Sequence, residues 1–466
     1  MALQFFNTLS RQKEEFVPLN PPAVKLYTCG PTVYNYAHIG NFRTYVFEDL
    51  LRRYLEYKGY QVMHVMNITD VEDKIIRTVR EQKISLTELT TKFTQAFFED
   101  RDTLGIKPAH QYPRATEHIQ EMFRLIETLL AKGIAYRSED GSIYYSIAKF
   151  ANYGALAHLH PDELKPGVRV KQDEYEKEAA TDFALWKAWD EKDGEVGWDS
   201  PWGRGRPGWH LECSAMAMKY LGEELDIHCG GVDNIFPHHQ NEIAQSEPCT
   251  GKTFVKYWLH SSHLRVEDKK MSKSLGNFYT LRDLLAKGWG GREIRYELIN
   301  AHYRLPVNFT MEGIEGARSA LGRIDEVRTK LKEVAGETTP GKVPSAEVDR
   351  AMKGFEEALD DDLNVSGALG VLFEFVRETN RRLGARNLSA EEAAGMLAAW
   401  DKFDAVIGFG APPASEIPAE IQQLVEERLA SRKAKNFKRA DEIRAELTKR
   451  GWILEDTPQG ARVKKV

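Results

Sequence analysis

Residues 38–41, His38-Ile39-Gly40-Asn41, have the types and order expected of a phosphate-binding turn. They lie at the start of a segment with helical apolar spacing, and the free backbone N–H groups at a helix N-terminus favour an anion. The His38 imidazole and the Asn41 amide can hydrogen-bond phosphate oxygens there, and Gly40 lets a flat ring approach the backbone closely. A structural histidine at the start of a helix is the alternative interpretation. The tetrapeptide alone does not separate the two.

A second motif, residues 270–274, has the sequence Lys-Met-Ser-Lys-Ser and is followed by Leu275-Gly276-Asn277. Its two ammonium groups can close over a triphosphate and neutralise the charge that develops in phosphoryl or nucleotidyl transfer. A polar surface loop is the alternative, but so specific a pentapeptide is rare by chance. The chain has no P-loop, and no G-x-G-x-x-G turn joins its first expected strand and helix. These two motifs are therefore the candidates for binding a nucleotide.

His238 and Glu242 are candidate metal ligands because they are four positions apart. On a helix this spacing places the two side chains one above the other, as two ligands of one ion require. A surface pair on a helix is the alternative hypothesis. The four cysteines have no regular framework spacing, which favours a reducing compartment and a ligand role over disulfides. Spacing alone gives no reason to pair Cys29 with Cys213.

A β-α-β unit is expected to position the first motif. Residues 25–28 are predicted to form a short strand, 42–57 a helix, and 61–68 a buried strand. Such a unit opens a parallel sheet, whose ligands bind beyond the carboxyl ends of the strands. Residues 29–41 therefore lie where a ligand is expected.

The remaining sequence predicts an α/β protein with a doubly wound parallel, Rossmann-like sheet, an insertion, a helical bundle and a small C-terminal module. Sheet-like character resumes at residues 225–233, after a run rich in Trp, Gly and Pro, and residues 408–418 are the clearest linker. The expected boundaries are 1–115 and 207–260 for the two halves of the sheet domain, 116–206 for the insertion, 261–315 for the lysine-loop region, 316–410 for the bundle and 411–466 for the basic module.

Length and composition fit a folded protein of about three domains. The chain has 466 residues, 42% hydrophobic and 29% charged, with a mean hydropathy of −0.49. Without a signal peptide or a long apolar run, we expect a cytoplasmic protein without membrane contact. Net charge is −6, yet residues 421–466 hold twelve Lys and Arg against seven Asp and Glu. This basic end favours a polyanionic partner, with a solvated helical surface as the alternative.

These motifs together resemble the class I aminoacyl-tRNA synthetases. Residues 38–41 are similar to the His-Ile-Gly-His signature of that class, with Asn in the last place, and residues 270–274 match its Lys-Met-Ser-Lys-Ser signature. The similarity is greatest to the cysteinyl-tRNA synthetase family and extends from about residue 25 to residue 460. The blocks that carry it are CGPTVYNYAHIGNFRTYV, NITDVEDKI, PGWHLECSAMAMKYLG, DIHCGGVDNIFPHHQNEIAQSE, KMSKSLGNF, ALDDDLN, RKAKNFKRADEIRAEL and LEDTPQG.

The resemblance implies one Zn²⁺ per chain, held by Cys29, Cys213, His238 and Glu242. This borderline-soft ion accepts thiolate, imidazole and carboxylate ligands. An ordinary pocket separates amino acids as similar as cysteine, serine and alanine only about 10–200-fold. A thiophilic metal in the active site can instead bind the substrate thiol as thiolate. We therefore expect no separate editing domain.

The resemblance also implies roles for further residues. Catalysis is assigned to His38, Asn41, Lys270 and Lys273. ATP binding is assigned to His38, Gly40, Asn41, His228, Asp233, Lys270, Lys273 and Ser274. The amino-acid pocket is assigned to Cys29, Gly30, Thr69 and Trp209. Thr69, Trp209, His228 and Asp233 are equally compatible with satisfied core groups. The tRNA contacts are assigned to Arg432, Lys433, Lys435, Lys438, Arg439 and Arg444, in a module that reads the anticodon loop in the family.

Three positions leave alternatives open. Trp452 is either a stacking surface for a base or a core residue. Cys229 stands where the family has Gly, so it crowds the adenosine pocket, adds a thiol near the zinc, or is a tolerated small hydrophobe. Gln240 replaces a common Glu and is expected to point away from the ligands.

The activity implied by the resemblance is a two-step ligation. Mg²⁺-bound ATP and L-cysteine give cysteinyl-adenylate, and a terminal adenosine hydroxyl of tRNA-Cys then takes the cysteinyl group. A monomer is expected. Two alternatives stay open: a cysteine-activating ligase with a small-amine acceptor, as in the mycothiol pathway, and a non-catalytic tRNA-binding paralogue. The first lacks an anticodon module, and the intact motifs of this chain argue against the second.

Overall fold

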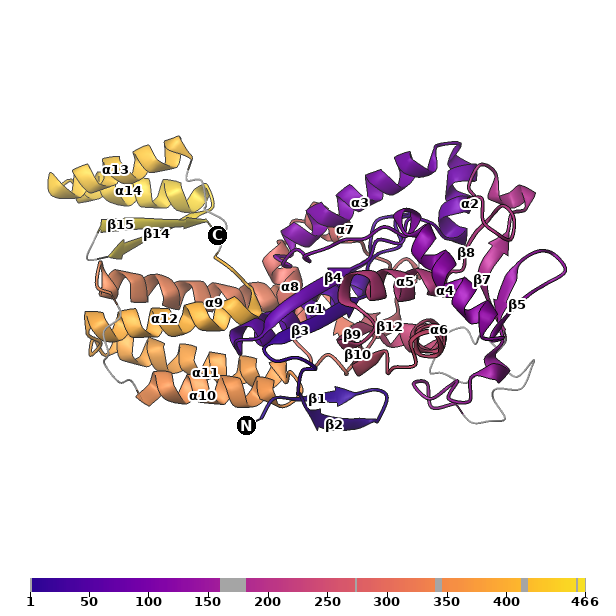
Figure 1. Ribbon diagram of the computed structural model, residues 1–466. Helices are drawn as coiled ribbons and strands as arrows, with labels where there is room; N and C mark the ends of the chain where they lie inside the picture. The colour runs from indigo at the N-terminus through magenta and orange to yellow at the C-terminus, as the bar shows by residue number, and fades with distance from the viewer. Residues whose placement is uncertain are drawn as a thin grey trace. The chain divides into compact units, whose positions relative to one another are not determined.

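The computed structural model of the chain describes residues 2–159, 182–272, 275–339, 346–411, 418–457 and 460–465. Its elements are shown in Figure 1. The chain divides into two compact units, Met1–Gly410 and Ala411–Val466. The phosphate turn (residues 38–41) and the lysine loop (residues 270–274) both belong to the larger unit.

A four-stranded sheet of order β10-β9-β3-β4 is the centre of the larger unit. Its strands, all paired in parallel, are β3 (Ala23–Thr28), β4 (Gln61–Met66), β9 (Leu225–Gly231) and β10 (Val255–Ser261). Its covering helices are α1 (Ile39–Tyr57), α5 (Trp209–Leu221) and α6 (Gln240–Thr250). Leu26 packs into the α1 core and Tyr27 into the α5 core, and neighbouring strand residues point to opposite faces. Helices therefore cover both faces of the sheet.

The chain leaves this sheet after β4 and forms an insertion before α5. The elements of this excursion are α2 (Asp73–Gln82), α3 (Leu86–Thr103), α4 (Ile119–Ala131), β5 (Ala135–Arg137), β6 (Ile143–Tyr145), β7 (Phe183–Ala188) and β8 (Gly205–Pro207). Strands β5 to β8 form an antiparallel sheet in chain order. Buried Trp186 of β7 packs edge-on against Phe123 of α4, with ring centroids 5.1 Å apart. The insertion thus has an aromatic core that it shares with α5 and α6 of the sheet domain.

Short elements support the main sheet and the lysine loop. They are the hairpin β1 (Gln4–Asn7) and β2 (Gln12–Glu15), the sheet of β11 (Leu264–Val266), β12 (Lys269–Lys270) and β13 (Val307–Phe309), and the helices α7 (Leu281–Ala286) and α8 (Gly291–Ile299). Single turns of helix occur at Ala115–Glu117, Ile147–Lys149, Glu191–Asp193, Val232–Asn234 and Ile235–His239. The lysine loop leaves directly from the end of β12.

A helical bundle follows, made of α9 (Met311–Ala335), α10 (Ala346–Asp360), α11 (Val365–Gly384) and α12 (Ala390–Ile407). These helices lie side by side in Figure 1. Ser389 and Glu392 close the first turn of α12 by a capping box. Phe355 of α10 and Phe403 of α12 meet in the core with ring centroids 4.8 Å apart. Aromatic packing between facing helices therefore contributes to the core of the bundle, together with many aliphatic side chains.

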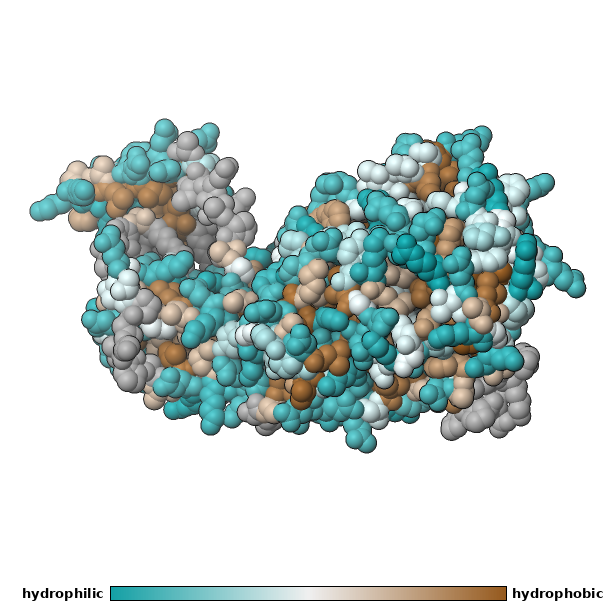
Figure 2. All heavy atoms as spheres, in the orientation of Figure 1, coloured by the Kyte–Doolittle hydropathy of each residue, from teal (hydrophilic) through white to brown (hydrophobic). Residues whose placement is uncertain are grey.

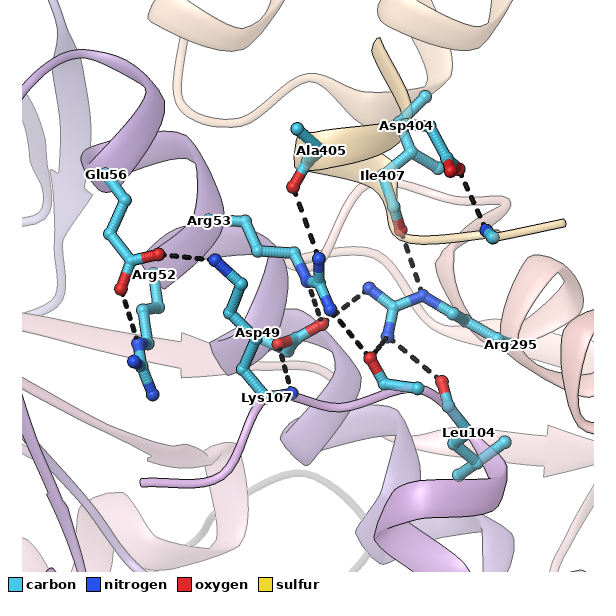
Figure 3. A network of polar contacts seen from close by, with 12 residues as sticks. Asp49, Arg52, Arg53, Glu56, Leu104, Lys107, Arg295, Asp404, Ala405 and Ile407 are labelled. Carbon is cyan, nitrogen blue, oxygen red and sulfur yellow. Dashed lines mark hydrogen bonds and ion pairs between the residues drawn. The ribbon is translucent and has the colours of Figure 1, made fainter. Parts of the chain in front are cut away.

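A buried arginine network joins the middle of α1 to the end of α12 (Figure 3). Asp49 Oδ2 accepts hydrogen bonds from Arg53 at 2.7 Å and from Arg295 at 2.6 Å. Arg295 also donates to the Ile407 carbonyl at 2.9 Å, and Arg53 to the Ala405 carbonyl at 3.2 Å. The last carbonyls of a helix lack intrahelical partners, and cations are favourable there. The network thus ties the bundle to the helix that begins at the phosphate turn.

The smaller unit contains α13 (Ala419–Lys433), α14 (Phe437–Lys449), β14 (Trp452–Thr457) and β15 (Gly460–Lys465). The two strands pair antiparallel. Trp452 is 5% exposed and packs with Ile443 and Leu447 of α14. Of the two interpretations of Trp452, the core residue is the one that the structure supports.

The predicted fold class is confirmed: a parallel sheet covered on both faces, an antiparallel insertion, a helical bundle and a small C-terminal unit. Figure 2 shows hydrophilic residues over much of the visible face, with the hydrophobic ones in separate patches. Among the described residues no helix combines the length and the apolar character needed to span a membrane. Cys229 is fully buried in the core on the α1 side of the sheet, which favours the tolerated small hydrophobe.

Replacing Arg295 with Met should lower the free energy of unfolding by about 3–5 kcal/mol, because it leaves Asp49 buried without its main partner. Burial alone raises the pKa of Asp49, but Arg295 and Arg53 bring it below its ordinary value. The stabilisation is therefore present at neutral pH and lost as the pH falls through the acidic range. Urea titrations at pH 7 and at about pH 2, which lies below the ordinary pKa of an aspartate, measure both effects.

The matched control is Arg381→Met, which removes an exposed ion pair with Glu378 on α11. We expect no measurable change for this variant. Equal, small effects of Arg295→Met and Arg381→Met would contradict the role given to the network.

Candidate active site

The first turn of α1 is closed by a reciprocal cap between His38 and Asn41. The Asn41 backbone N–H donates to His38 Nδ1 at 3.1 Å, and the His38 backbone N–H donates to Asn41 Oδ1 at 3.1 Å. Because Nδ1 is an acceptor, a neutral His38 imidazole carries its proton on Nε2. Asn41 Oδ1 is likewise occupied, so the group that Asn41 can offer to a ligand is its NH₂. Both side chains can thus act as donors, as an oxyanion requires.

Gly30 and Gly40 stand where a side chain would collide with this turn or its support. A Cβ on Gly40 would lie 2.9 Å from His38 Nδ1 and 3.2 Å from the Met271 methyl. A Cβ on Gly30 would lie 1.8 Å from the Asn67 carbonyl oxygen. Close approach of the His38 ring and of the two strand ends therefore requires glycine at both positions.

A first cavity of about 270 Å³ lies between the phosphate turn and the lysine loop. His38, Gly40 and Asn41 line one part of it, and Lys270 and Met271 line another. The ends of β9 and β10 contribute Gly230, Gly231, Asp233, Ser261, Ser262 and His263. Lys273 and Ser274, the other two residues assigned to this site, lie outside the described residues. The cavity has donors and a cation, as a polyphosphate requires.

Four metal-ligating side chains meet near the His38 turn, and we call them the thiol cluster. They are Cys29 after β3, Cys213 on α5, His238 before α6 and Glu242 on α6, and their ligand atoms all lie within 4.8 Å of one another. Glu242 Oε1 is buried and receives no hydrogen bond, although His238 Nε2 lies 3.2 Å away. Two sulfurs, one imidazole nitrogen and one carboxylate oxygen are a donor set that fits Zn²⁺. The residues present therefore fit the expected ion.

A second set, Cys29 with His228, His239 and Glu242, satisfies the same distance criterion. Two observations favour the thiol cluster. Glu242 Oε2 is already hydrogen-bonded to His228 Nε2 at 3.0 Å, which leaves Oε1 for a metal. Moreover, Cys213 and His238 line the second cavity described below, whereas His228 and His239 do not.

A chain of polar contacts runs from Thr8 through two histidines to the Cys29 sulfur. Thr8 Oγ1 lies 2.7 Å from His260 Nδ1, His260 Nε2 lies 2.8 Å from His239 Nδ1, and His239 Nε2 lies 3.3 Å from Cys29 Sγ. Burial lowers the pKa of His260 to about 3 and that of His239 well below its ordinary value, so both rings are neutral. With neutral rings, every contact is satisfied if each group donates toward the sulfur. His239 then donates an N–H to Cys29, which stabilises a thiolate.

His210 and Trp209 position the ring of His238. His210 Nδ1 and His238 Nδ1 lie 2.9 Å apart, which leaves His238 Nε2 toward Glu242 and a metal. Trp209 stacks on the His238 ring with centroids 4.4 Å apart and planes inclined by 26°. Such outer contacts fix the tautomer and orientation of a ligating imidazole.

Without a cation the thiol cluster favours its protonated forms. Burial raises the pKa of the Cys29 thiol, and neighbouring Cys213 and Glu242 raise it further. Burial also raises the pKa of Glu242, against the opposing effect of His228. A bound dication reverses this balance because it stabilises thiolate and carboxylate together.

The second cavity, of about 350 Å³, adjoins the thiol cluster and holds the residues assigned to the amino acid. Cys29, Gly30, Thr69 and Trp209 all line it. Thr69 is 2% exposed, and its Oγ1 accepts from Asn67 Nδ2 at 3.0 Å. Trp209 is 40% exposed, which suits a ring that covers a ligand. The structure thus brings these four residues together.

His228 is not at the nucleotide cavity, contrary to the expectation from the resemblance. It is fully buried on the α6 side of β9, stacked on Trp258 with ring centroids 4.8 Å apart, and bound to Glu242. The reason is the position of His228 within β9, since the residues at the end of that strand reach the cavity. Asp233, which follows β9, does line both cavities.

Several lining residues escaped the sequence analysis. Thr44 Oγ1 and Ser261 Oγ lie 2.8 Å apart in the wall of the first cavity. Ser262 and His263 follow β10 and line the same cavity. For Ser261, Ser262 and His263, the position at the carboxyl end of a parallel strand is the signal that could have found them.

The basic residues assigned to tRNA follow the end of α13 and the length of α14. Arg432, Lys433, Lys435, Lys438 and Arg444 are exposed, and half-buried Arg439 pairs with Glu427 at 2.8 Å. Phe437, which the sequence analysis did not single out, begins α14 and is 60% exposed. An exposed aromatic ring among basic side chains is a surface on which a base can stack.

Comparison with protein families finds three consecutive matches. Residues 15–319 match the family model of the tRNA synthetases class I (C) catalytic domain. Residues 354–411 match the DALR domain, and residues 414–463 match the cysteinyl-tRNA ligase anticodon binding domain.

Two curated relatives agree with these matches. The chain is 50% identical over 470 residues to a cysteine--tRNA ligase of Protochlamydia amoebophila, covering 100% of this chain and 98% of the relative. It is also 50% identical over 479 residues to that of Chlamydia muridarum, covering 100% of both chains.

Two solved structures share the fold. Methionyl-tRNA synthetase of Mycobacterium tuberculosis with methionyl-adenylate has a TM-score of 0.62 at 14% identity and covers 82% of this chain and 90% of its own. A leucyl-tRNA synthetase ternary complex (LeuRS-tRNA-LeuAMS) from Agrobacterium radiobacter K84 has a TM-score of 0.62 at 11% identity, covering 84% and 85%. At these identities the likeness concerns the fold alone.

Replacing Cys213 with Ser should remove most of the zinc that copurifies with the chain, because a hydroxyl is a poor ligand for this ion. Metal content measured by mass spectrometry gives the result, with about one ion per chain expected for the unaltered protein. Cys249→Ser is the control, since Cys249 lies outside the cluster and its thiol faces the Leu125 carbonyl at 3.7 Å. Equal zinc content in both variants would contradict the assignment.

Zinc affinity should also rise with pH between about 6 and 8. The raised pKa of Cys29 keeps its thiol protonated at neutral pH, so binding must displace protons. Titration of metal-free protein in a weak buffer should therefore acidify the solution. Binding without proton release would contradict the thiolate ligands.

Proposed function

The chain belongs to the cysteinyl-tRNA synthetase family and is a cysteine--tRNA ligase, and from this premise we propose which residues carry each step. One observation carries the proposal: the thiol cluster and the phosphate turn open into cavities that share Cys29, Gly30, His38 and Asn41. A single amino acid can therefore present its side chain to the cluster and its carboxylate to a nucleotide. This supports activation of cysteine at the junction of the two cavities.

In the first step a carboxylate oxygen of L-cysteine attacks the α-phosphorus of magnesium-bound ATP. The bond from that phosphorus to the bridging oxygen breaks, pyrophosphate leaves with the electron pair, and cysteinyl-adenylate remains. His38 Nε2–H and the Asn41 NH₂ group donate to phosphate oxygens while charge shifts among them. Lys270 and Lys273 neutralise the departing pyrophosphate. Catalysis here is positioning and charge stabilisation, without a protein nucleophile.

Selection of cysteine rests on the thiol cluster. Zn²⁺ bound there supplies a soft ion for the substrate thiolate, for which a serine hydroxyl is a poor substitute. His239 keeps Cys29 in its ligating form, and His210 keeps Nε2 of His238 directed to the ion. Trp209 and Thr69 line the space that the amino acid fills. Selection at this step explains why the proposal needs no second, hydrolytic site.

In the second step the 2′-hydroxyl of the terminal adenosine of tRNA-Cys attacks the carbonyl carbon of the adenylate, and AMP leaves. The basic face of α13 and α14 binds the anticodon loop, with Phe437 as a stacking surface. The six basic residues supply the charge that attracts phosphates.

The match of residues 414–463 to an anticodon binding domain argues against a small-amine acceptor. The cavities and the thiol cluster argue against a non-catalytic paralogue. A monomeric state and a cytoplasmic location stay predictions.

Aminoacylation of total tRNA with labelled cysteine and ATP tests the function. We expect acid-precipitable cysteine on tRNA and at least about 200-fold less serine, the separation beyond which an ordinary pocket fails. Cysteine-dependent pyrophosphate exchange without charging of tRNA would contradict the proposal that tRNA is the acceptor, but it would still support activation of cysteine. Equal charging of tRNA with serine would contradict the proposal that a metal ion selects cysteine.

Replacing Phe437 with Ala should raise the KM for tRNA about fivefold or more, because stacking contributes about 1–3 kcal/mol per base. Pyrophosphate exchange, which needs no tRNA, should stay unchanged. Ile453→Ala is the control, since Ile453 is also exposed and lies on β14 between the core residues Trp452 and Leu454. An unchanged KM in Phe437→Ala would contradict the stacking role.

A further inference from the structure

The side chain of Asn277 bridges the two sides of the lysine loop at its base. The Ser272 backbone N–H donates to Asn277 Oδ1 at 2.9 Å. Asn277 Nδ2 donates to the Lys270 carbonyl at 3.1 Å and, at the longer distance of 3.4 Å, to the Val266 carbonyl. The amide therefore joins the outgoing side of the loop, the returning side and the end of β11.

These contacts require an amide, because one group must both accept and donate. Asparagine offers a carbonyl oxygen for the Ser272 N–H and two N–H bonds for the two carbonyls. Aspartate would keep the acceptor but would point a carboxylate oxygen at the Lys270 carbonyl. Alanine would leave all three backbone groups without this partner. The two substitutions thus remove different parts of the same contact.

The residues after Asn277 pack against the phosphate turn. The Phe278 ring meets the His38 imidazole edge-on, with ring centroids 5.3 Å apart. The Tyr279 carbonyl accepts from the Ile39 N–H at 3.0 Å, and Thr280 pairs with His38 in an isolated bridge. Residues 277–280 are therefore one continuous support for both motifs.

The position of this support matches the needs of the first cavity. Lys270 and Met271 line it from the lysine loop, and His38 lines it from the phosphate turn, whereas Asn277 is not among its lining residues. A shift of the Asn277 amide moves Lys270 relative to His38, because Asn277 is hydrogen-bonded to the Lys270 carbonyl and the residues that follow it contact His38. Asn277 acts on the reaction through these residues and not through substrate.

We propose that Asn277 is a positioning residue for adenylate formation, which holds Lys270 at its distance from His38 across the phosphate site. The proposal rests on the function proposed above. Misplacement of a reacting or stabilising group by about 1 Å costs about a hundredfold in rate. Loss of Asn277 should therefore lower kcat for activation far more than it raises the KM for ATP.

The experiment compares Asn277→Ala and Asn277→Asp with Asn308→Ala in the full chain. Asn308 is a matched control because its Oδ1 accepts from the Asp268 N–H at 2.7 Å, at the turn of the β11–β12 hairpin that carries the lysine loop. Cysteine-dependent ATP–pyrophosphate exchange gives kcat and KM separately. Single-turnover transfer from preformed cysteinyl-adenylate to tRNA measures the second step, in which pyrophosphate has already left.

We expect both Asn277 variants to lose about 30- to 100-fold in the kcat of exchange, with the KM for ATP within about threefold and the transfer step unchanged. Asn308→Ala should exchange at the rate of the unaltered protein. Exchange within threefold of the unaltered rate in both Asn277 variants, an equal loss in Asn308→Ala, or an equal loss in the transfer step would overturn the proposal. Absence of exchange in the unaltered protein would instead refute the proposed function on which it rests.

Discussion

The burial of two thiols, a carboxyl and an imidazole in one place is the constraint on which the active site depends. Burial and mutual repulsion raise the pKa of Cys29, so the cluster is costly to ionise without a cation. In the ion pairs of the described residues, all partners of the Glu242 carboxylate are histidines. A bound dication would resolve the conflict, and a chain of hydrogen-bonded histidines, His260 and His239, ends at Cys29 Sγ. The cluster is therefore a buried site whose donor atoms fit a thiophilic ion.

The parallel sheet is what makes this constraint useful. Cys29 follows β3, and His38 follows Cys29 by nine positions at the start of α1, so the candidate metal ligands and the phosphate turn lie together beyond the carboxyl ends of the strands. The same helix is held at Asp49 by the arginine network that ends in the bundle. The phosphate turn thus begins a helix, α1, whose middle is fixed by this network. The support at residues 277–280 adds the lysine loop to this frame from the other side.

Much of this organisation was predictable, and the failures have physical reasons. The β-α-β unit follows from local periodicity. Residue types and spacing made the phosphate turn and the lysine loop candidates for nucleotide binding, which the family resemblance supports and which stays a prediction. The proximity of Cys29 and Cys213 did not follow from their spacing, because it arises only when α5 packs against the sheet. In the sequence, only the family resemblance linked the two. His228 lies away from the two cavities because its place within the buried strand β9 directs its side chain toward Glu242 and Trp258. The choice between a core role and a stacking role for Trp452 depended on the packing of α14 against β14, which the sequence does not show. Asn277 was visible in sequence, but its three contacts exist only once the loop has folded.

X-ray absorption at the zinc edge, recorded on the unaltered protein alone, with L-cysteine and with L-serine, tests the central claim most directly. The account predicts a first shell with two sulfurs and lighter ligands in the free protein, at the Zn–S distance of about 2.3 Å expected for thiolates. L-cysteine should add a third sulfur to that shell, and L-serine should leave the sulfur count unchanged. A sulfur shell that does not change with L-cysteine would show that the cluster is structural, and selection of the amino acid would need another explanation.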